Sequence, residues 1–272
     1  MTDVTSRRDA RARAARKEGG VRTALRLVSY LSILAVWWVG SSTLGTFLPG
    51  PVETVAFAAR EFERGAMWFH LGITTQRVLI AFTIAMSAGV ALGAAMGLSK
   101  RVDDLLQGWL ILTLTVPRIL LFVVAYLLLG LSDRALGIAL VITVLPTIIV
   151  SVREGTRAID PKLIEMARAF RRDRSTIWWN VVFPQLMPFI IGTARGSLAL
   201  SWKMVVLGEL LGRTSGVGYQ ISFYFQFFNM AGILAYGLTM MVVLAVIDLG
   251  IMGAIQKRAF RWRSEFKVGG VG

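Results

Sequence analysis

Residues 159–188 read IDPKLIEMARAFRRDRSTIWWNVVFPQLMP and form a charged island between two long apolar runs. The island opens with Asp160 and Pro161, a helix-capping residue followed by a proline suited to the first helical turn. Apolar residues then recur at helical spacing, at Leu163, Ile164, Met166, Ala167 and Phe170. Pro184 and Pro188 mark the return to an apolar segment. The stretch therefore predicts a short amphipathic helix whose apolar face needs a partner.

The chain around this island is apolar enough to lie in a membrane. Hydrophobic residues make up 55% of it, and its mean hydropathy is +0.63. A helix needs about 20 apolar residues to cross the hydrocarbon core. Six runs fit that length, at 27–47, 78–98, 105–131, 135–152, 183–211 and 233–255. We predict an all-α polytopic membrane protein with about six spans, or five if one run is interfacial.

The basic charge of the chain is distributed unevenly along the sequence. The net charge is +14 and the pI is about 11.1. With six spans and both termini inside, most lysines and arginines fall on the cytoplasmic side, in residues 1–26, 99–104, 153–182 and 256–272. This asymmetry follows the positive-inside rule and predicts cytoplasmic termini rather than a nucleic-acid partner. We expect basic tails at 1–26 and 263–272 around a membrane domain at 27–262, with anionic lipid as a weaker partner for the first tail.

The residue inventory argues against catalytic and metal chemistry. The chain has no cysteine and a single histidine, His70, with no cluster of carboxylates near it in the sequence, so a metal site is not expected. The glycines of GRTSGVGY lack the Lys-Ser/Thr ending of a phosphate-binding loop. We therefore predict no catalytic residue and no cofactor bound by this chain.

Four segments in order carry a family resemblance. They are LPGP with the amphipathic stretch up to residue 63, SKRVDDLL, VREGTRAIDPKLIEMARAF and GELLGRTSGVGY. Together, over residues 48–262, they resemble the permease subunits of ABC importers for nitrate, sulfonate, taurine and pyrimidine precursors. Within the island, Glu165, Ala167 and Pro184 fall where the EAA loop of these permeases has its Glu, second Ala and terminal Pro.

The resemblance implies the transmembrane domain of a type I ABC importer in a bacterial inner membrane. Two permease copies would pair, each docked to one ATPase that binds ATP and Mg, and an external solute-binding protein would deliver the solute. The loop at 153–182 would couple to the ATPase through Asp160, Pro161, Leu163, Glu165, Met166, Ala167, Phe170, Arg171 and Pro184. In this view Glu165 contacts the ATPase cleft, Ala167 permits close approach, and the larger apolar residues supply buried area.

One position departs from the family pattern. Arg171 stands where the family usually has a glycine, six residues after the EAA glutamate. Glycine there ends the helix in a left-handed conformation, which costs other residues about 1 kcal/mol or more. We expect the helix to continue past Arg171 or the turn to shift toward Asp173.

Charged residues inside the spans are candidates for a translocation pathway. Pro117 predicts a kink in the third span. Next to it, Arg118 either lines the pathway, favouring a carboxylate or sulfonate, or pairs with an acid of another helix. Arg195 and Lys203 are eight residues apart and could face one cavity, although Arg195 fits a structural role equally well. Glu209 either gates the pathway or pairs with Lys203. Asp248 is expected to form a structural salt bridge.

Two other classes of protein remain as alternatives. A proton-coupled secondary transporter would need carboxylates in its pathway, for which only Glu209 and Asp248 are candidates. It would also leave the EAA loop unexplained. A membrane scaffold that moves no solute is the third reading. For an importer, the solute stays open among sulfonate, taurine, nitrate, aromatic carboxylate and pyrimidine precursor.

Overall fold

The computed structural model describes residues 24–254 and residue 258, and every regular element in that part of the chain is a helix. Helices long and apolar enough to span a membrane are Ala24–Leu44, α3 (Ala66–Leu98), α6 (Asp133–Arg157), Arg174–Gly212 and Met230–Gly250. A bent pair, α4 (Lys100–Thr115) and α5 (Arg118–Leu129), makes a sixth span if it is counted as one. The all-α polytopic prediction is confirmed, and most of both predicted tails lies outside the described residues.

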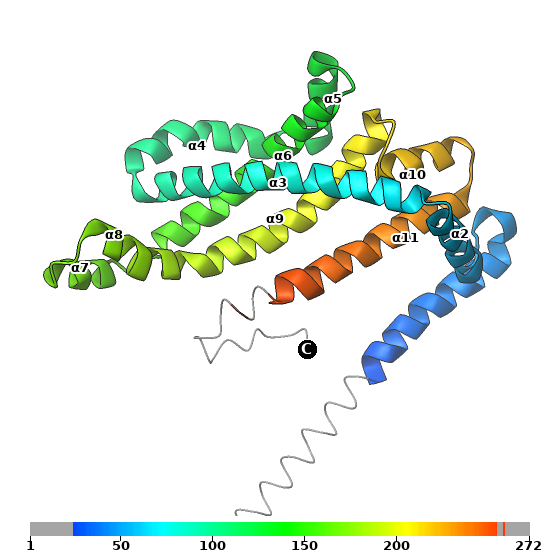
Figure 1. Cartoon of the computed structure of the whole chain (residues 1–272), viewed down its shortest axis with the longest axis horizontal. Coiled ribbons are helices and arrows are strands. Elements are labelled where there is room, and N and C mark those ends of the chain that lie inside the picture. The colour runs from blue at the N-terminus through cyan, green and yellow to red at the C-terminus, as the bar shows by residue number, and fades with distance from the viewer. Residues whose placement is uncertain (1–23, 255–257, 259–272) are drawn as a thin grey trace, which may run out of the picture.

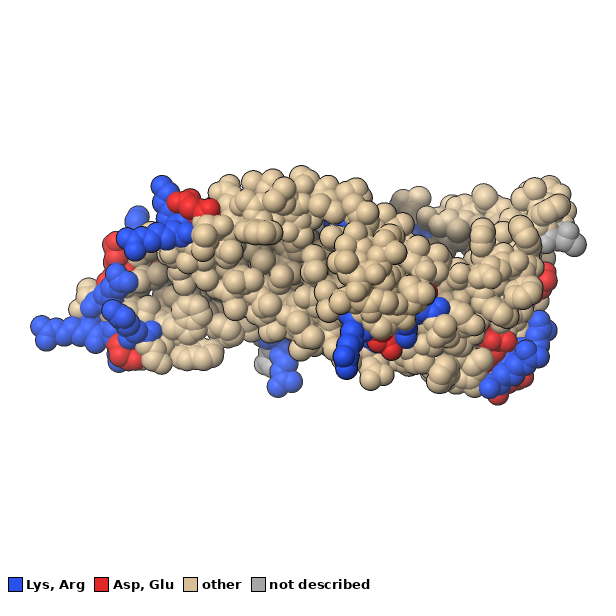
Figure 2. Space-filling view, turned by 90° about the horizontal axis from the view of Figure 1, so that it is seen from above, with Lys and Arg blue, Asp and Glu red and all other residues tan. Residues whose placement is uncertain are grey.

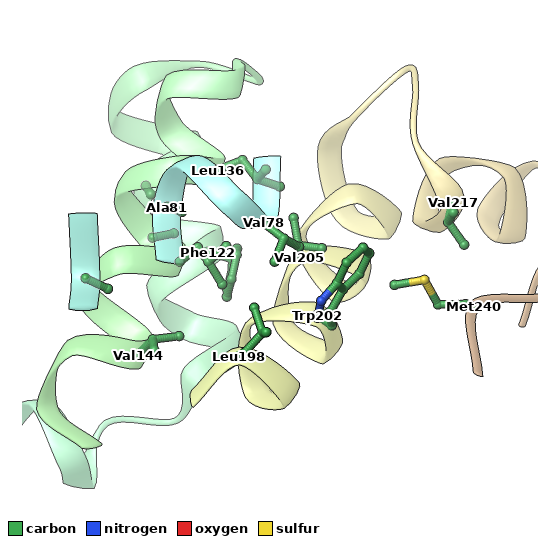
Figure 3. Packing of buried hydrophobic residues seen from close by; sticks show 14 of the residues in the cluster. Val78, Ala81, Phe122, Leu136, Val144, Leu198, Trp202, Val205, Val217 and Met240 are labelled. Carbon is green, nitrogen blue, oxygen red and sulfur yellow. The ribbon is translucent and has the colours of Figure 1, made fainter. Parts of the chain in front are cut away.

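The centre of the molecule is the packing of α3 against α6 and of α6 against α9 (Phe183–Gly212), which run beside one another in Figure 1. Gly89, Gly93 and Gly97 form a one-sided row on α3, where an added Cβ would lie 2.4–2.8 Å from atoms of α6. Small residues at this spacing let two helices approach closely within a membrane. Trp202 of α9 and Phe122 of α5 fill the adjoining core (Figure 3).

The third predicted span is broken rather than kinked. Helix α4 ends at Thr115, α5 begins at Arg118, and the two axes differ by 97°. Val116 and Pro117 between them are both extended, with ψ of 129° and 125°. A residue before proline is disfavoured in the α conformation, so two consecutive residues leave the helix here and the chain turns.

The second span is longer than hydropathy predicted. Helix α3 begins at Ala66, so residues 66–77, which were assigned to the outer side, are helical. Arg77 is therefore not a loop charge, since its side chain is 9% exposed within the helix bundle. The polar residues of the first three turns were mistaken for a loop because a hydropathy window registers their polarity but not their burial.

The two ends of the bundle carry different short elements. Helices α2 (Pro51–Glu63) and α10 (Val217–Gln226) lie at one end, and α11 (Met230–Val246) runs from it. Helices α7 (Pro161–Ala169) and α8 (Arg174–Ile177) lie at the opposite end (Figure 1). Lysines and arginines gather over the α7 end (Figure 2).

Candidate functional site

Helix α7 forms as the sequence predicts and is tied to the start of α9. The carboxylate of Asp160 accepts the backbone N–H of Lys162 at 2.9 Å, and Pro161 occupies the first turn. The side chain of Gln185 accepts the N–H of Asp160 at 3.1 Å. Gln185 follows Pro184 in the first turn of α9, so this hydrogen bond joins the start of α7 to the start of a membrane-spanning helix.

The apolar residues of α7 divide between two faces. Leu163, Met166 and Phe170 are exposed by 40%, 52% and 73%. Glu165 is exposed beside them. Ala167, in contrast, is 8% exposed and packs in a small cluster of this chain's own residues, with Ile159, Ile177 and Val182. The methyl group of Ala167 therefore packs against this chain's own residues, and its role in the approach of a partner stays a prediction.

Helix α7 ends at Ala169, and the chain turns at Arg171 instead of continuing as a helix. Arg171 has φ of 51°, in the left-handed region that glycine adopts most easily. The N–H of Arg171 bonds to the carbonyl of Arg168, and that of Arg172 to the carbonyl of Ala167, at 2.8 and 3.1 Å. These two bonds make a Schellman turn. The turn keeps its place despite the arginine, so the expected continuation is wrong.

The turn also does not shift to Asp173, which begins the next helix. The carboxylate of Asp173 accepts the hydroxyl and the backbone N–H of Thr176 and so caps α8. These hydrogen bonds, the hydroxyl's first, lower the pKa of Asp173 below its usual value. Because α8 begins directly after Asp173, the turn between α7 and α8 is confined to the residues before it, and Arg171 adopts the left-handed conformation.

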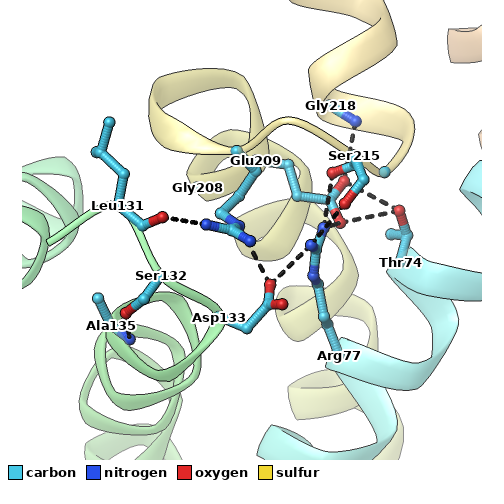
Figure 4. Close-up of polar contacts among 12 residues, drawn as sticks. Thr74, Arg77, Leu131, Ser132, Asp133, Ala135, Gly208, Glu209, Ser215 and Gly218 are labelled. Carbon is cyan, nitrogen blue, oxygen red and sulfur yellow. Dashed lines mark hydrogen bonds and ion pairs between the residues drawn. The ribbon is translucent and has the colours of Figure 1, made fainter.

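At the opposite end of the bundle, a polar cluster joins α3, α6 and α9. Its members are Thr74, Arg77, Asp133, Glu209, Arg213 and Ser215, here called the outer polar cluster (Figure 4). Arg77 pairs with both Glu209 and Asp133 at 2.7 Å, and Arg213 pairs with Asp133 at 3.1 Å. Glu209 is fully buried, so the prediction that it pairs with Lys203 is wrong.

The outer polar cluster also fixes the start of α10. Three successive backbone N–H groups, those of Gly216, Val217 and Gly218, each donate to a different side chain: His70 Nδ1, Thr74 Oγ1 and a carboxylate oxygen of Glu209, at 2.9–3.0 Å. Gly216 has φ of +105° and faces the Glu209 carboxylate with no room for a Cβ. Helix α10 is therefore held to α3 and α9 and is not a free flap.

Sequence reasoning missed this cluster although a signal was present. His70, Thr74 and Arg77 are spaced four and three residues apart, which places them on one face of a helix. A polar row at this spacing next to an apolar run indicates a helix that continues through the polar residues. His70 is thus a hydrogen-bond acceptor for Gly216, and no group of metal-ligating side chains occurs among the described residues.

A groove of about 310 Å³ lies between α9 and α11, here called the α9–α11 groove. Arg195, Lys203 and Asp248 all line it, together with Trp202 and Met241. Arg195 and Asp248 form a bidentate ion pair with distances of 2.5 and 2.7 Å. The predicted salt bridge of Asp248 is confirmed, and Arg195 and Lys203 do share one cavity wall.

The structure changes the setting of Arg118. This residue is exposed at the first turn of α5, directly after the break at Pro117, and is not part of the α9–α11 groove. The 97° bend places Arg118 at the start of a separate helix rather than inside one straight span. No acidic partner for Arg118 occurs within the part of the chain that the structure describes.

An all-helical bundle with polar residues inside its spans and a short helix at its basic end is the architecture of a polytopic membrane protein and is compatible with a transport subunit. The chain belongs to the family of binding-protein-dependent transport system inner membrane components, whose pattern it matches over residues 85–261. It is the permease subunit of an ABC importer in the inner membrane, and a separate ATPase hydrolyses the ATP. The proton-coupled transporter and the scaffold are not favoured.

Curated relatives and solved structures agree with this assignment. The chain is 25% identical to the taurine transport system permease protein TauC of Escherichia coli, with 86% of this chain and 87% of TauC covered. It is 30% identical to the putative aliphatic sulfonates transport permease protein SsuC of E. coli, with 83% of each covered. The nitrate import permease protein NrtB of Synechococcus elongatus is 26% identical, with 84% of this chain and 84% of NrtB covered.

Two solved transporters share the fold of this chain. An inward-facing MetNI methionine ABC transporter matches with a TM-score of 0.56 at 17% identity, over 68% of this chain and 93% of that one. An amino acid ABC transporter with histidines matches with a TM-score of 0.56 at 16% identity, over 76% and 97%. The fold is that of the transmembrane domain of a type I ABC importer.

Proposed function

We propose that two copies of this chain pair in the membrane and together move a small anionic solute, which an external binding protein delivers. Each copy docks one ATPase through α7, and ATP and Mg bind to that ATPase. The termini lie on the cytoplasmic side. The observation that carries the proposal is the uncovered apolar row on α7.

Helix α7 has the properties of a docking element. Leu163, Met166 and Phe170 are apolar and exposed on a short helix at the most basic end of the molecule. By the positive-inside rule that end is cytoplasmic, where water makes an uncovered apolar row unfavourable. Covering this row with a partner protein removes its apolar surface from water, which favours binding. The exposed Glu165 of the same helix supplies a charge that can orient the partner. We assign the loop at 153–182 to this docking.

The need for a second copy follows from the membrane face of α9. Lys203 lies about nine residues before Gly212, roughly 14 Å below the outer end of the helix at about 1.5 Å per residue. It is exposed, and a charge at that depth is costly against lipid. Another copy of the chain would turn this face into the wall of a shared, water-filled pathway. Arg118 and Pro117, at the α4–α5 break, are proposed to border the same pathway.

The class of solute is inferred from charge and from the relatives. Lys203 and Arg195 give the α9–α11 groove two cations against one carboxylate, that of Asp248. The similar permeases are named for taurine, aliphatic sulfonates and nitrate, which all carry an oxoanion group. A sulfonate, nitrate or carboxylate therefore fits this chain better than a cation or a neutral sugar.

Uptake by the reconstituted complex tests this function. The permease, its co-purified ATPase and the binding protein are placed in proteoliposomes, and accumulation of labelled taurine, nitrate and benzoate is measured with and without ATP. ATP-dependent uptake of at least one of these solutes is expected. Uptake that follows a proton gradient and ignores ATP would contradict the proposal.

A further inference from the structure

We propose that the α9–α11 groove is a binding site within each copy for one singly charged oxoanion, held by the ammonium group of Lys203 and the indole N–H of Trp202. This inference rests on the proposed function, because it gives the importer a recognition site of its own in addition to the one on the binding protein.

The groove is built on one face of α9. Arg195, Leu198 and Trp202 are spaced three and four residues apart and line it together, and α11 supplies the opposite wall with Met241. At about 310 Å³ the groove is at the small end of the range for ligand sites, roughly 300–1,000 Å³. This size suits a small anion with a few water molecules rather than a large organic molecule.

The groove contains one cation, Lys203, that is not balanced by a carboxylate of the described chain. The bidentate pair of Arg195 and Asp248, at 2.5 and 2.7 Å, is neutral as a unit. Lys203 lines the same groove, and no ion-pair or hydrogen-bond partner for it occurs among the residues that the structure describes. A lone ammonium at mid-membrane depth is stabilised by a counter-ion. One negative charge on the bound solute balances it.

Trp202 supplies an orphaned hydrogen-bond donor. Its side chain is 1% exposed, and its Nε1 has no acceptor. Figure 3 shows this nitrogen on the side of the indole that faces Leu198, another residue of the groove wall. A buried donor without an acceptor is costly. Nε1 exposes less than 1 Å² of surface, so the indole has to turn toward the groove before an oxoanion there can accept its N–H and contact Lys203 at the same time.

Neither Glu209 nor Arg77 takes part in this site. Both are committed to the outer polar cluster, where Glu209 is fully buried against Arg77 and Thr74. The groove is therefore chemically separate from the anchoring of α10, and its residues can be changed without opening that cluster.

Equilibrium binding to the purified complex in nanodiscs, without the binding protein, tests the site. Calorimetric titrations use methanesulfonate, nitrate and benzoate, with methanesulfonamide as the uncharged probe. We expect saturable binding of at least one of the three anions and none of methanesulfonamide. Lys203→Met should weaken that binding about ten-fold or more, as loss of a charge-assisted contact does, and Lys203→Arg should keep most of it. Trp202→Phe should weaken it about five-fold.

Matched controls separate the site from the importer. Arg134→Gln removes an exposed cation of α6 outside the groove and should leave anion binding unchanged. Size-exclusion profiles and ATPase co-purification check that each variant is folded. Absence of saturable binding for all three anions, or equal affinity in wild type and Lys203→Met, overturns the site. If the ATPase still co-purifies in that case, the importer stands without the site; if it does not, the proposed function fails as well.

Discussion

At the end of the bundle that holds the outer polar cluster, Arg77 and Glu209 are charged, buried and paired within the chain, whereas at the opposite end Met166 and Phe170 are apolar and uncovered. The outer arrangement is satisfied by the chain alone, because every backbone N–H from Gly216 to Gly218 has an acceptor there. The apolar row of α7 has no such partner within the described chain and is the surface that we propose the ATPase covers. The first region is therefore expected to matter for the stability of the fold, and the second for association.

The largest expected effect is at the outer end. Glu209→Leu removes the carboxylate that Arg77, Thr74 and Gly218 all contact and leaves a buried arginine short of its partner. Losing one partner of a buried pair costs about 3–5 kcal/mol. We expect a markedly lower melting temperature of the purified permease. The melting temperature is measured from the fraction of protein that still elutes as the folded species in size-exclusion chromatography after heating. Glu63→Leu, at an exposed glutamate of α2, is the control; equal melting of both variants would mean that the cluster does not store stability.

The second expected effect is at the α7 end and concerns association rather than stability. Met166→Glu places a charge in the middle of the exposed apolar row and should weaken ATPase binding by about 2 kcal/mol, roughly thirty-fold. The melting temperature of the permease alone should not change. Asn180→Glu, an exposed position of the same end outside α7, is the control. Retention of the ATPase by Met166→Glu in a quantitative pull-down would remove α7 from the interface.

These two regions differ in how far the sequence predicts them. The α7 helix was predictable, because its cap, its proline and its apolar spacing are all local to ten residues, 160–169. The partner of Glu209 was not, because Arg77 is 132 residues away in the chain and a hydropathy window excluded it from the span. Long-range pairing of this kind depends on which helices touch, and that information is not in the local pattern.

Two smaller differences have equally physical reasons. A kink was expected at Pro117, but Val116 leaves the helix as well, and two extended residues turn the chain by 97°. Arg171 was expected to displace the turn after α7. The tertiary anchors on both sides, Ala167 in its cluster and Asp173 capping α8, hold the turn in place and force the arginine into the left-handed conformation.

A smaller effect is expected from the capping of α6 near the outer polar cluster. The hydroxyl of Ser132 accepts the N–H of Ala135 at 3.2 Å. Ser132→Ala should cost about 1 kcal/mol, a typical value for an N-cap. Thermal melting of the permease measures it, with Ser87→Ala of α3 as the control, since that hydroxyl bonds only to carbonyls of its own helix. A melting temperature for Ser132→Ala no lower than that of Ser87→Ala would rule out the cap.

The smallest expected effect is a gain at the turn after α7. Arg171→Gly removes the strain of a left-handed arginine, which stabilises the folded state by about 1 kcal/mol. Glycine also raises the conformational entropy of the unfolded chain, which lowers the free energy of unfolding by about 0.4–1 kcal/mol. A net stabilisation of a few tenths of a kcal/mol is expected. Hydrogen exchange of residues 161–170 should slow slightly in Arg171→Gly and quicken in the control Arg172→Gly. Faster exchange in Arg171→Gly would show that the turn is not strained.

Recovery of partners from native membranes tests the central claim most directly. The tagged full-length chain is solubilised in mild detergent and purified, and everything that accompanies it is identified by mass spectrometry. We predict one ATPase, present in the same molar amount as the permease, together with a binding protein for an anion. Recovery of this chain alone, under conditions that keep other ABC importers of the same membranes intact, would contradict the account.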